Sequence, residues 1–496
     1  MNSTIDLTPS KAWDPWRPTA ADPWNRKWAA HLYRRAGFGA GREQLDAAEK
    51  LGHEAAIDLL LQGTPKSAAI LPTLLDVGQV AAAREDGGDK LRDWWLYCML
   101  QGEHPLREKL TLFWHNHFAT SIAKVRGTNL MFRQNRTLRD HALGTFEPFL
   151  QAMSRDPAML LWLDSNSNVK GKPNENYARE VMELFSLGVG NYKETDIREA
   201  ARAFTGWHTD GKAFRFKAEV HDAGSKTFFG KTGHWNGNDI VKMILEQPSA
   251  ARFLVGKIYS FFVSEIAPPD GLLEPLHQLF RKSDYNIATL MKTVLSSRWF
   301  FSDRAFRKRI KNPVEFVLGA VQTVYRDYGE GHESYQPLPQ AVLTPRISAM
   351  AQTLFAPPNV KGWPGGKAWL NTSTLLERNN FASALASGTL WHEMYRHGQR
   401  MEDTIQGNQT IFIIEKPEPP ARAFDPARVI ADDAVNRPGQ IVRTLIELYL
   451  PGGIRPEAES KLTAFLANGK PTGAALDIRV RELVHALMTM PEYQLC

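Results

Sequence analysis

Two histidines one residue apart, His115 and His117, are the first side chains in this sequence that could do chemistry. If the backbone there is extended, both imidazoles face one side and can chelate a metal ion. If Leu106–Phe118 is an unbroken helix, His115 lies about 160° from His117 and one metal cannot reach both. The pair is therefore either a set of nitrogen ligands in a helix that breaks near Trp114, or a core His117 with a surface or groove His115.

A second polar set lies on one side of a predicted helix and consists of Asn174, Glu175, Asn176, Arg179, Glu180 and Glu183. On a helical wheel Glu175, Arg179 and Glu183 fall within about 80° of one another. The carboxylates could supply metal ligands or a general acid and base, with Arg179 beside them and the asparagines contacting a substrate. The alternative is a solvated helix face held together by i,i+4 ion pairs.

A third set is the adjacent pair His221 and Asp222, followed by Lys226 in a Gly-rich stretch. On a loop, a histidine oriented by Asp222 could move protons, and Lys226 could bind an anion. The alternative is an ordinary polar surface loop.

A fourth candidate is the irregular segment Phe355–Asn371, FAPPNVKGWPGGKAWLN. Its prolines and glycines predict a fixed loop without regular structure. Trp363 and Trp369 could line a cleft and stack on a sugar or a base. The alternative is a structural loop wrapped on the core.

Helices must position these side chains, because helical patterning dominates from Trp28 onward. Pro and Asn signals predict a helix that opens at Pro173-Asn174 and closes at Gly188, and others over Ala158–Leu163, Asp196–Phe204, Asp239–Gln247 and Val314–Tyr325. The turn signal Asp210-Gly211 and the glycines after it predict a small β-hairpin and irregular insertion near residues 206–237. The expected fold is mainly α.

The organisation predicted along the chain has four parts. Residues 1–25 form an extended arm rich in Pro and Trp, and residues 26–402 form the main helical domain. Residues 403–425 form a Pro-rich connector, with a strand-like Thr410–Ile414. A C-terminal helical subdomain at residues 426–496 packs on the main domain.

The composition of the 496 residues sets outer limits on function. Apolar residues make up 43% and the net charge is +6, which fits a globular protein and excludes a disordered one. A charge of this size on so large a surface does not predict nucleic-acid binding. Two cysteines define no disulfide framework, and no apolar run is long enough for a membrane span. The N-terminal residues show no signal peptide, so a cytoplasmic location is expected, with periplasmic location or export through a partner as the alternative.

Seven segments together resemble a bacterial family, domain of unknown function 1800. They are His31–Gly39, Arg107–Ser121, Arg155–Asp164, Pro173–Tyr192, Ala200–Trp207, His221–Gly230 and Phe355–Asn371. The resemblance covers nearly the whole chain and implies a mainly helical fold but no established activity. It also implies export in many members and genes beside a sulfatase-like family. Its polar signatures fall on the sets above, and on Asp156 and Asp164.

Two enzyme hypotheses follow. In the first, His115 and His117 join a carboxylate from Glu175, Glu180 or Glu183 to bind Zn, Fe or Mn, and His221 moves protons in hydrolytic or oxidative chemistry.

In the second, no metal takes part, and a carboxylate pair such as Asp164 and Glu175 hydrolyses a glycan or peptide on a Trp platform. A third hypothesis is a non-catalytic binding or assembly protein that acts with the sulfatase-like partner, its polar signatures forming a buried network that fixes the fold.

Overall fold

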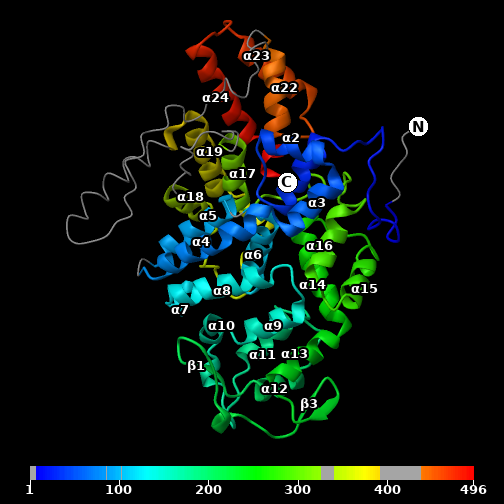
Figure 1. Ribbon diagram of the computed structural model, residues 1–496, viewed down its shortest axis with the longest axis vertical. Coiled ribbons are helices and arrows are strands. Elements are labelled where there is room, and N and C mark those ends of the chain that lie inside the picture. Colours follow the sequence, from blue (N-terminus) through cyan, green and yellow to red (C-terminus); the bar gives the residue numbers. More distant parts are fainter. Residues whose placement is uncertain (1–6, 85–86, 102, 326–339, 391–436) are drawn as a thin grey trace, which may run out of the picture. The chain divides into compact units, whose positions relative to one another are not determined.

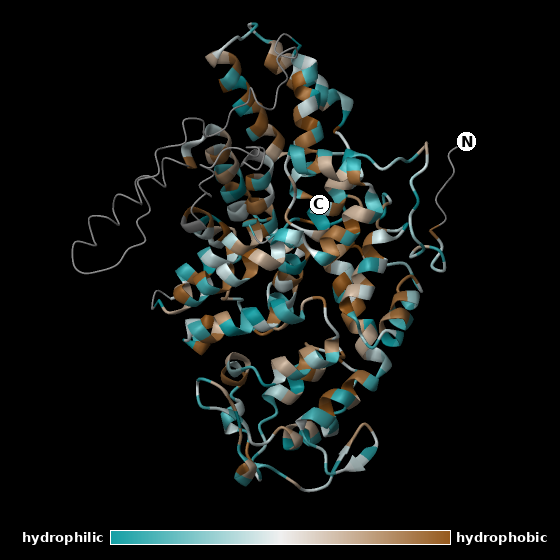
Figure 2. Ribbon diagram, viewed as in Figure 1, coloured by the Kyte–Doolittle hydropathy of each residue, from teal (hydrophilic) through white to brown (hydrophobic). Residues whose placement is uncertain are grey.

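The computed structural model describes residues 7–84, 87–101, 103–325, 340–390 and 437–496. The fold is mainly α, as the sequence predicts, and its strands form two small antiparallel hairpins (Figure 1). Most helices carry both apolar and polar residues along their length (Figure 2), which is the amphipathic pattern of helices packed on a core. No helix of the described residues is long and apolar enough to cross a membrane.

The chain divides into two compact units that alternate along the sequence. The first unit comprises Met1–Arg17, Ile57–Lys308 and Thr353–Pro364, and the second comprises Pro18–Ala56, Arg309–Gln352 and Gly365–Cys496. The predicted boundaries near residues 402 and 425, the Pro-rich connector and the strand-like Thr410–Ile414 lie outside the described residues.

The first unit holds every candidate site residue except Trp369. Its helices are α4 (Pro65–Ala82), α5 (Asp89–Gln101), α6 (Pro105–His117), α7 (Ile122–Val125), α8 (Thr128–His141), α9 (Phe146–Ser154), α10 (Pro157–Trp162), α11 (Asn176–Glu183), α12 (Glu194–Ala203), α13 (Gly237–Glu246), α14 (Pro248–Phe262), α15 (Glu274–Lys282) and α16 (Ile287–Ser296). Short 3-10 turns lie at η1 (Ser165–Ser167) and η2 (Ala218–Val220). In the arm, Trp13 and Trp16 are buried, and the indole of Trp13 donates to the carbonyl of Leu272 at 2.6 Å.

The second unit is a separate helical core. Its elements are α1 (Arg26–Ala36), α2 (Arg42–Leu51), α17 (Pro313–Tyr325), α18 (Gln340–Ala349), η3 (Gly366–Trp369), α19 (Thr372–Ser387), α22 (Pro438–Tyr449), α23 (Pro456–Ala467), α24 (Ala474–Thr489) and α25 (Pro491–Gln494). The helix α3 (His53–Gln62) begins in the second unit and continues into the first.

The β insertion lies in the first unit where the sequence places it. Strands β1 (Trp207–Thr209) and β2 (Phe214–Phe216) pair antiparallel, with Trp207 opposite Phe216. Strands β3 (Lys226–Phe228) and β4 (Lys231–Gly233) form a second hairpin. The first hairpin packs on α10 and the second on α12 (Figure 1).

Capping residues locate the helices around the site. Asp156 caps α10 as expected, because its carboxylate accepts from the backbone N–H of Met159 at 2.9 Å. The helix α11 is shorter than predicted. The side-chain oxygen of Asn174 accepts from the backbone N–H of Asn176 at 2.8 Å, so the helix begins at Asn176. It ends at Glu183, and Gly188, at φ +81°, closes the turn that follows.

Candidate functional site

The helix α6 is fixed by a buried ion pair. Glu108 receives two hydrogen bonds from the guanidinium of Arg139 on α8, at 2.6 and 3.0 Å, and a third from the indole of Trp95 at 3.3 Å. Both charged groups are almost fully buried. The Arg139 guanidinium and these hydrogen bonds outweigh burial and hold the pKa of Glu108 below its usual value. The ion pair therefore anchors the first turns of α6 to α8.

The helix α6 is continuous to His117, which agrees with the unbroken-helix alternative and contradicts the break near Trp114 that the metal hypothesis requires. Helical periodicity consequently points the two imidazoles to different neighbours. His115 Nε2 accepts from the backbone N–H of Phe355 at 3.1 Å, and His117 Nε2 lies 3.0 Å from the carbonyl oxygen of Phe185, to which it donates. Each histidine thus holds the backbone of a different segment.

Burial keeps both imidazoles neutral. It lowers the pKa of His115 to about 3, and it lowers the pKa of His117 well below 6.5, helped by the nearby Lys257 ammonium. Within the described ranges no three His, Cys, Asp or Glu side chains are placed to hold a metal ion. The ligand set expected from His115, His117 and a glutamate is therefore not assembled, because the unbroken helix separates the two rings.

Asn116, between the two histidines, anchors the segment that ends at Pro364. Its side-chain oxygen accepts from the N–H of Trp363 at 2.7 Å, and its Nδ2 donates to the Trp363 carbonyl at 3.4 Å. Gly362 has φ +78°, and a Cβ there would lie 2.1 Å from the Asn116 oxygen. The turn therefore requires glycine at residue 362. The sequence analysis did not identify Asn116 as a positioning residue, although Asn116 lies in the family segment Arg107–Ser121.

The tryptophans of this segment do not offer an open face. Trp363 is 6% exposed and packs 5.7 Å from the His115 ring, and Trp369 in the second unit is 5% exposed. This corrects the expectation that they form a stacking platform. Their size and burial make them core residues of an irregular loop.

The exposed end of the α11 polar face is an ion network. Arg179 donates to Glu175 at 3.2 Å and to both carboxylate oxygens of Glu194, at 3.0 and 2.9 Å. The Glu194 partner lies on α12, outside the reach of a helical-wheel argument. Glu175 and Arg179 therefore form the i,i+4 pair of the alternative interpretation, while Asn176 is exposed beside them.

The other end of the same face is different. Glu183 accepts from the hydroxyl of Tyr192 at 2.8 Å, and burial together with this contact raises the pKa of that tyrosine to about 12. Glu180 is half-buried, and no described residue donates a hydrogen bond to its carboxyl group. Burial and the neighbouring Glu183 charge raise the pKa of Glu180, while Lys361 and Arg179 oppose the rise. This end of α11 thus holds one carboxyl group without a described hydrogen-bond donor.

The turn after α11 is held from two sides. His117 donates to the carbonyl of Phe185, and the Lys257 ammonium lies 3.4 Å from the carbonyl oxygen of Leu184. Burial lowers the pKa of Lys257 to about 8. These contacts fix the end of the helix that carries Glu180 and Glu183.

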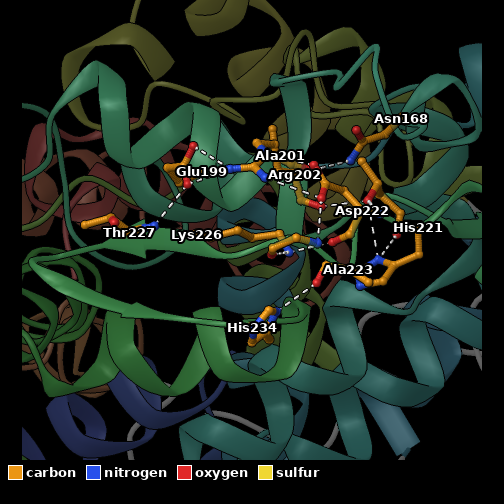
Figure 3. A network of polar contacts seen from close by, with 12 residues as sticks. Asn168, Glu199, Ala201, Arg202, His221, Asp222, Ala223, Lys226, Thr227 and His234 are labelled. Atoms are coloured by element: carbon orange, nitrogen blue, oxygen red, sulfur yellow. Dashed lines mark hydrogen bonds and ion pairs between the residues drawn. The ribbon is translucent and has the colours of Figure 1, made fainter.

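The His221–Asp222 loop is a structural network, shown in Figure 3. The Asp222 carboxylate accepts from Arg202 at 2.8 and 3.3 Å, and the pKa of Asp222 is lowered mainly by that guanidinium. His221 Nδ1 instead donates to the carbonyl of Thr205 at 2.8 Å. This corrects the expected orientation of His221 by Asp222. The partners Arg202 and Thr205 come from the quoted segment Ala200–Trp207, and sequence spacing alone did not link them to the loop.

Lys226 is buried and serves the same loop (Figure 3). Its ammonium donates to the carbonyl of Asp222 at 2.5 Å and to that of Gly224 at 2.9 Å, and burial lowers its pKa. Lys226 was expected to bind an anion. In the structure its ammonium instead binds two carbonyl groups of its own loop.

The two signature aspartates lie in unlike surroundings. Asp156 is buried, accepts from Gln134 at 2.7 Å, and has its pKa raised to about 6 by burial. Asp164 is exposed, has φ +57°, and pairs with Lys124 at 2.9 Å. Of the two carboxylates in the second hypothesis, Asp164 is paired with Lys124 and Glu175 with Arg179.

The fold is mainly helical, and side chains of the signature segments hold it together by hydrogen bonds to the backbone of other segments. The chain belongs to the family of proteins of unknown function DUF1800, whose model matches residues 31–495. No curated protein and no solved structure matches the chain.

Proposed function

We propose that the protein is an acid–base enzyme whose proton-transferring group is Glu180. The observation that carries this proposal is the half-buried Glu180 carboxyl group, which lacks a hydrogen-bond donor among the described residues and lies beside a second carboxylate. A general acid works best when its pKa is moved toward the working pH, and the direction of the Glu180 shift agrees with that need.

Three neighbouring groups support the role. Glu183, held by Tyr192, keeps a negative charge near Glu180 and favours its protonated form. Lys361 has the opposite effect on the pKa of Glu180, and its ammonium could bind the negative charge that develops on a substrate. The contacts of Asn116 with Trp363 and of His117 with Phe185 would keep these groups in place during a reaction.

The reaction class that suits these groups is hydrolysis of a polar bond. Glu180 in its acid form would donate a proton to the leaving-group atom as the bond between that atom and the substrate breaks. Glu180 in its base form would then take a proton from the water molecule whose oxygen forms the new bond to the substrate. None of these steps uses a metal ion, so the proposal is the metal-free carboxylate hypothesis moved from Asp164 and Glu175 to Glu180 and Glu183.

The test is a panel of nitrophenyl glycosides, nitrophenyl esters and peptide anilides. For any compound that the protein hydrolyses, Glu180→Gln should lower kcat by about 100-fold or more. The matched control is Glu147→Gln, since Glu147 lies on α9 and has no described side-chain partner. Unchanged turnover in Glu180→Gln contradicts the proposal.

A second candidate is a non-catalytic assembly protein acting with a sulfatase-like partner. The observation that favours it is that His115, Asn116 and Lys226 all bind backbone groups, as a network that only fixes the fold would do. Co-expression of the protein with the sulfatase-like neighbour tests it. A stable complex that also forms with Glu180→Gln favours assembly, and independent elution of the two proteins contradicts it.

A further inference from the structure

The hairpin β1–β2 carries an exposed aromatic ring on its outer strand. All residues of β1 are buried, whereas Phe216 on β2 is 51% exposed. The ring of Phe216 lies edge to face against that of His221, with the ring centroids 5.3 Å apart. A single exposed phenylalanine is ordinary on a protein surface, and the charges around this one make it informative.

Lysines and an arginine without carboxylate partners lie on and beside this hairpin. Lys217 follows Phe216 in the chain, and Lys212 lies in the turn between the two strands. Both side chains are exposed, and neither forms an ion pair with a described residue. Arg133 on α8 is also exposed, and its guanidinium donates to the backbone carbonyl of Lys212. The helix α8 thus brings a third unpaired cation to the hairpin.

The turn before α11 adds two more cations. Lys170 and Lys172 are exposed, and neither forms an ion pair with a described residue. The backbone N–H of Lys170 donates to the carbonyl of Val220 at 2.7 Å, which joins this turn to the segment that follows β2. Three segments that are separate in the sequence therefore bring unpaired cations to one region of the first unit.

The acidic side chains of these segments offset little of this charge. Asp210 is paired with Arg215 at 2.8 Å, and it also accepts from the backbone N–H groups of Lys212 and Ala213. Glu219, which follows β2, is exposed and has no ion-pair partner among the described residues. The unpaired cations therefore outnumber the unpaired carboxylates, and the surface is positive.

We infer that this surface docks the protein on a membrane that contains anionic phospholipids. We call it the hairpin patch, and it consists of Phe216 and the cations Arg133, Lys170, Lys172, Lys212 and Lys217. Clusters of about four to eight lysines and arginines are attracted by the negative surface potential of anionic lipids. The apolar ring of Phe216 can enter the boundary between headgroups and acyl chains.

The exposed ring favours a membrane over other polyanions. A single-stranded nucleic acid would also attract the cations, but proteins bind it through several aromatic rings that stack on successive bases. The hairpin patch supplies one such ring, on a strand flanked by lysine and arginine. This arrangement suits insertion of one apolar side chain between charged headgroups.

The experiment is co-sedimentation of the full chain with lipid vesicles, made of phosphatidylcholine alone or mixed with phosphatidylglycerol. The protein should pellet with the mixed vesicles and not with the neutral ones, and added salt should release it. Lys212→Glu combined with Lys217→Glu should weaken binding by about tenfold or more. Phe216→Ser should weaken it by about tenfold, and Phe216→Leu, which keeps the side chain apolar, should retain most of the binding.

Matched controls carry the same changes outside the hairpin patch. Lys242→Glu combined with Lys282→Glu changes the net charge equally at exposed residues of α13 and α15. Ile266→Ser removes an apolar side chain that is 61% exposed. These controls should bind vesicles like wild type.

The inference is overturned if the protein does not pellet with the mixed vesicles, or if the control pair weakens binding as much as the Lys212 and Lys217 pair. It is also overturned if Phe216→Ser binds vesicles like wild type, or if a single-stranded oligonucleotide binds more tightly than the vesicles. Either of these last results would mean that the surface binds a polyanion and not a bilayer. The inference is independent of the Glu180 proposal, since turnover is not measured.

Discussion

The last turn of α6 and the polar face of α11 are both dense in polar side chains, but they use them differently. On α6, His115, Asn116 and His117 each bond to the backbone of another segment. On α11, Arg179 is paired in solvent and Glu180 is left without a described donor. The two helices therefore differ: the polar side chains at the end of α6 hold backbone segments in place, whereas α11 keeps one half-buried carboxyl group without a described hydrogen-bond donor.

The largest effect should come from breaking the α6 region at Gly362. Gly362→Ala places a Cβ against the Asn116 side chain at a positive φ, and it should lower the free energy of unfolding by about 3 kcal/mol or more. Gly171→Ala is the matched control, since Gly171 has φ +81° but open space around its Cβ. It should cost only about 1 kcal/mol. Denaturant unfolding of both variants checks the difference, and equal losses would mean that the Asn116 contact does not hold the turn.

The next effect is the pH dependence of stability. The folded-state pKa of His115 is about 3, against 6.5 for the ordinary value, so the unfolded chain binds this proton at higher pH. The stabilisation from neutral His115 is therefore fully present above pH 6.5 and is lost as the pH falls from there toward 3. Below pH 6.5 the loss should be about 1.4 kcal/mol per pH unit for this group.

Replacement of His115 by a residue that does not titrate tests this pH dependence of the free energy of unfolding. Denaturant unfolding of wild type and of His115→Gln between pH 7 and pH 4.5 should give a shallower decline for the variant. Parallel declines would show that His115 does not titrate in this way.

The smallest effect is expected on the exposed part of α11. Arg179→Ala removes an ion network that is largely in solvent, and it should change Tm by less than about 2 °C. A calorimetric scan at low and at moderate salt measures it. A large fall in Tm that does not depend on salt would mean that Arg179 stabilises the packed core and not only a solvated ion network.

Sequence reasoning predicted what local rules decide. The caps and turn signals gave α10, the start of α17 and the hairpin β1–β2, because Asp156, Pro313 and Gly211 act on their immediate neighbours. The helical wheel also placed His115 and His117 on different sides of a continuous helix. The prediction of a metal pair required a break that the helix-forming residues of α6 do not provide.

What local rules could not give were the distant partners. Asp222 was expected to orient His221, but Arg202 on α12 takes its carboxylate. Glu175 is a catalytic candidate in the sequence, but in the structure it shares Arg179 with Glu194 of α12. Burial, which decides the charge state of His115, likewise depends on segments such as the one at Phe355, 240 residues away in the chain. Long-range partners and burial are properties of tertiary packing, and neither a helical wheel nor the spacing of residues in the sequence predicts them.

The proposed function depends on the Glu180 carboxyl group having a raised pKa. Carbon-13 NMR titration of protein carrying labelled glutamate measures it directly, with Glu180→Gln identifying the signal. The signal that is missing in Glu180→Gln should titrate with a midpoint above the ordinary value of 4.5. A midpoint at or below that value would contradict it.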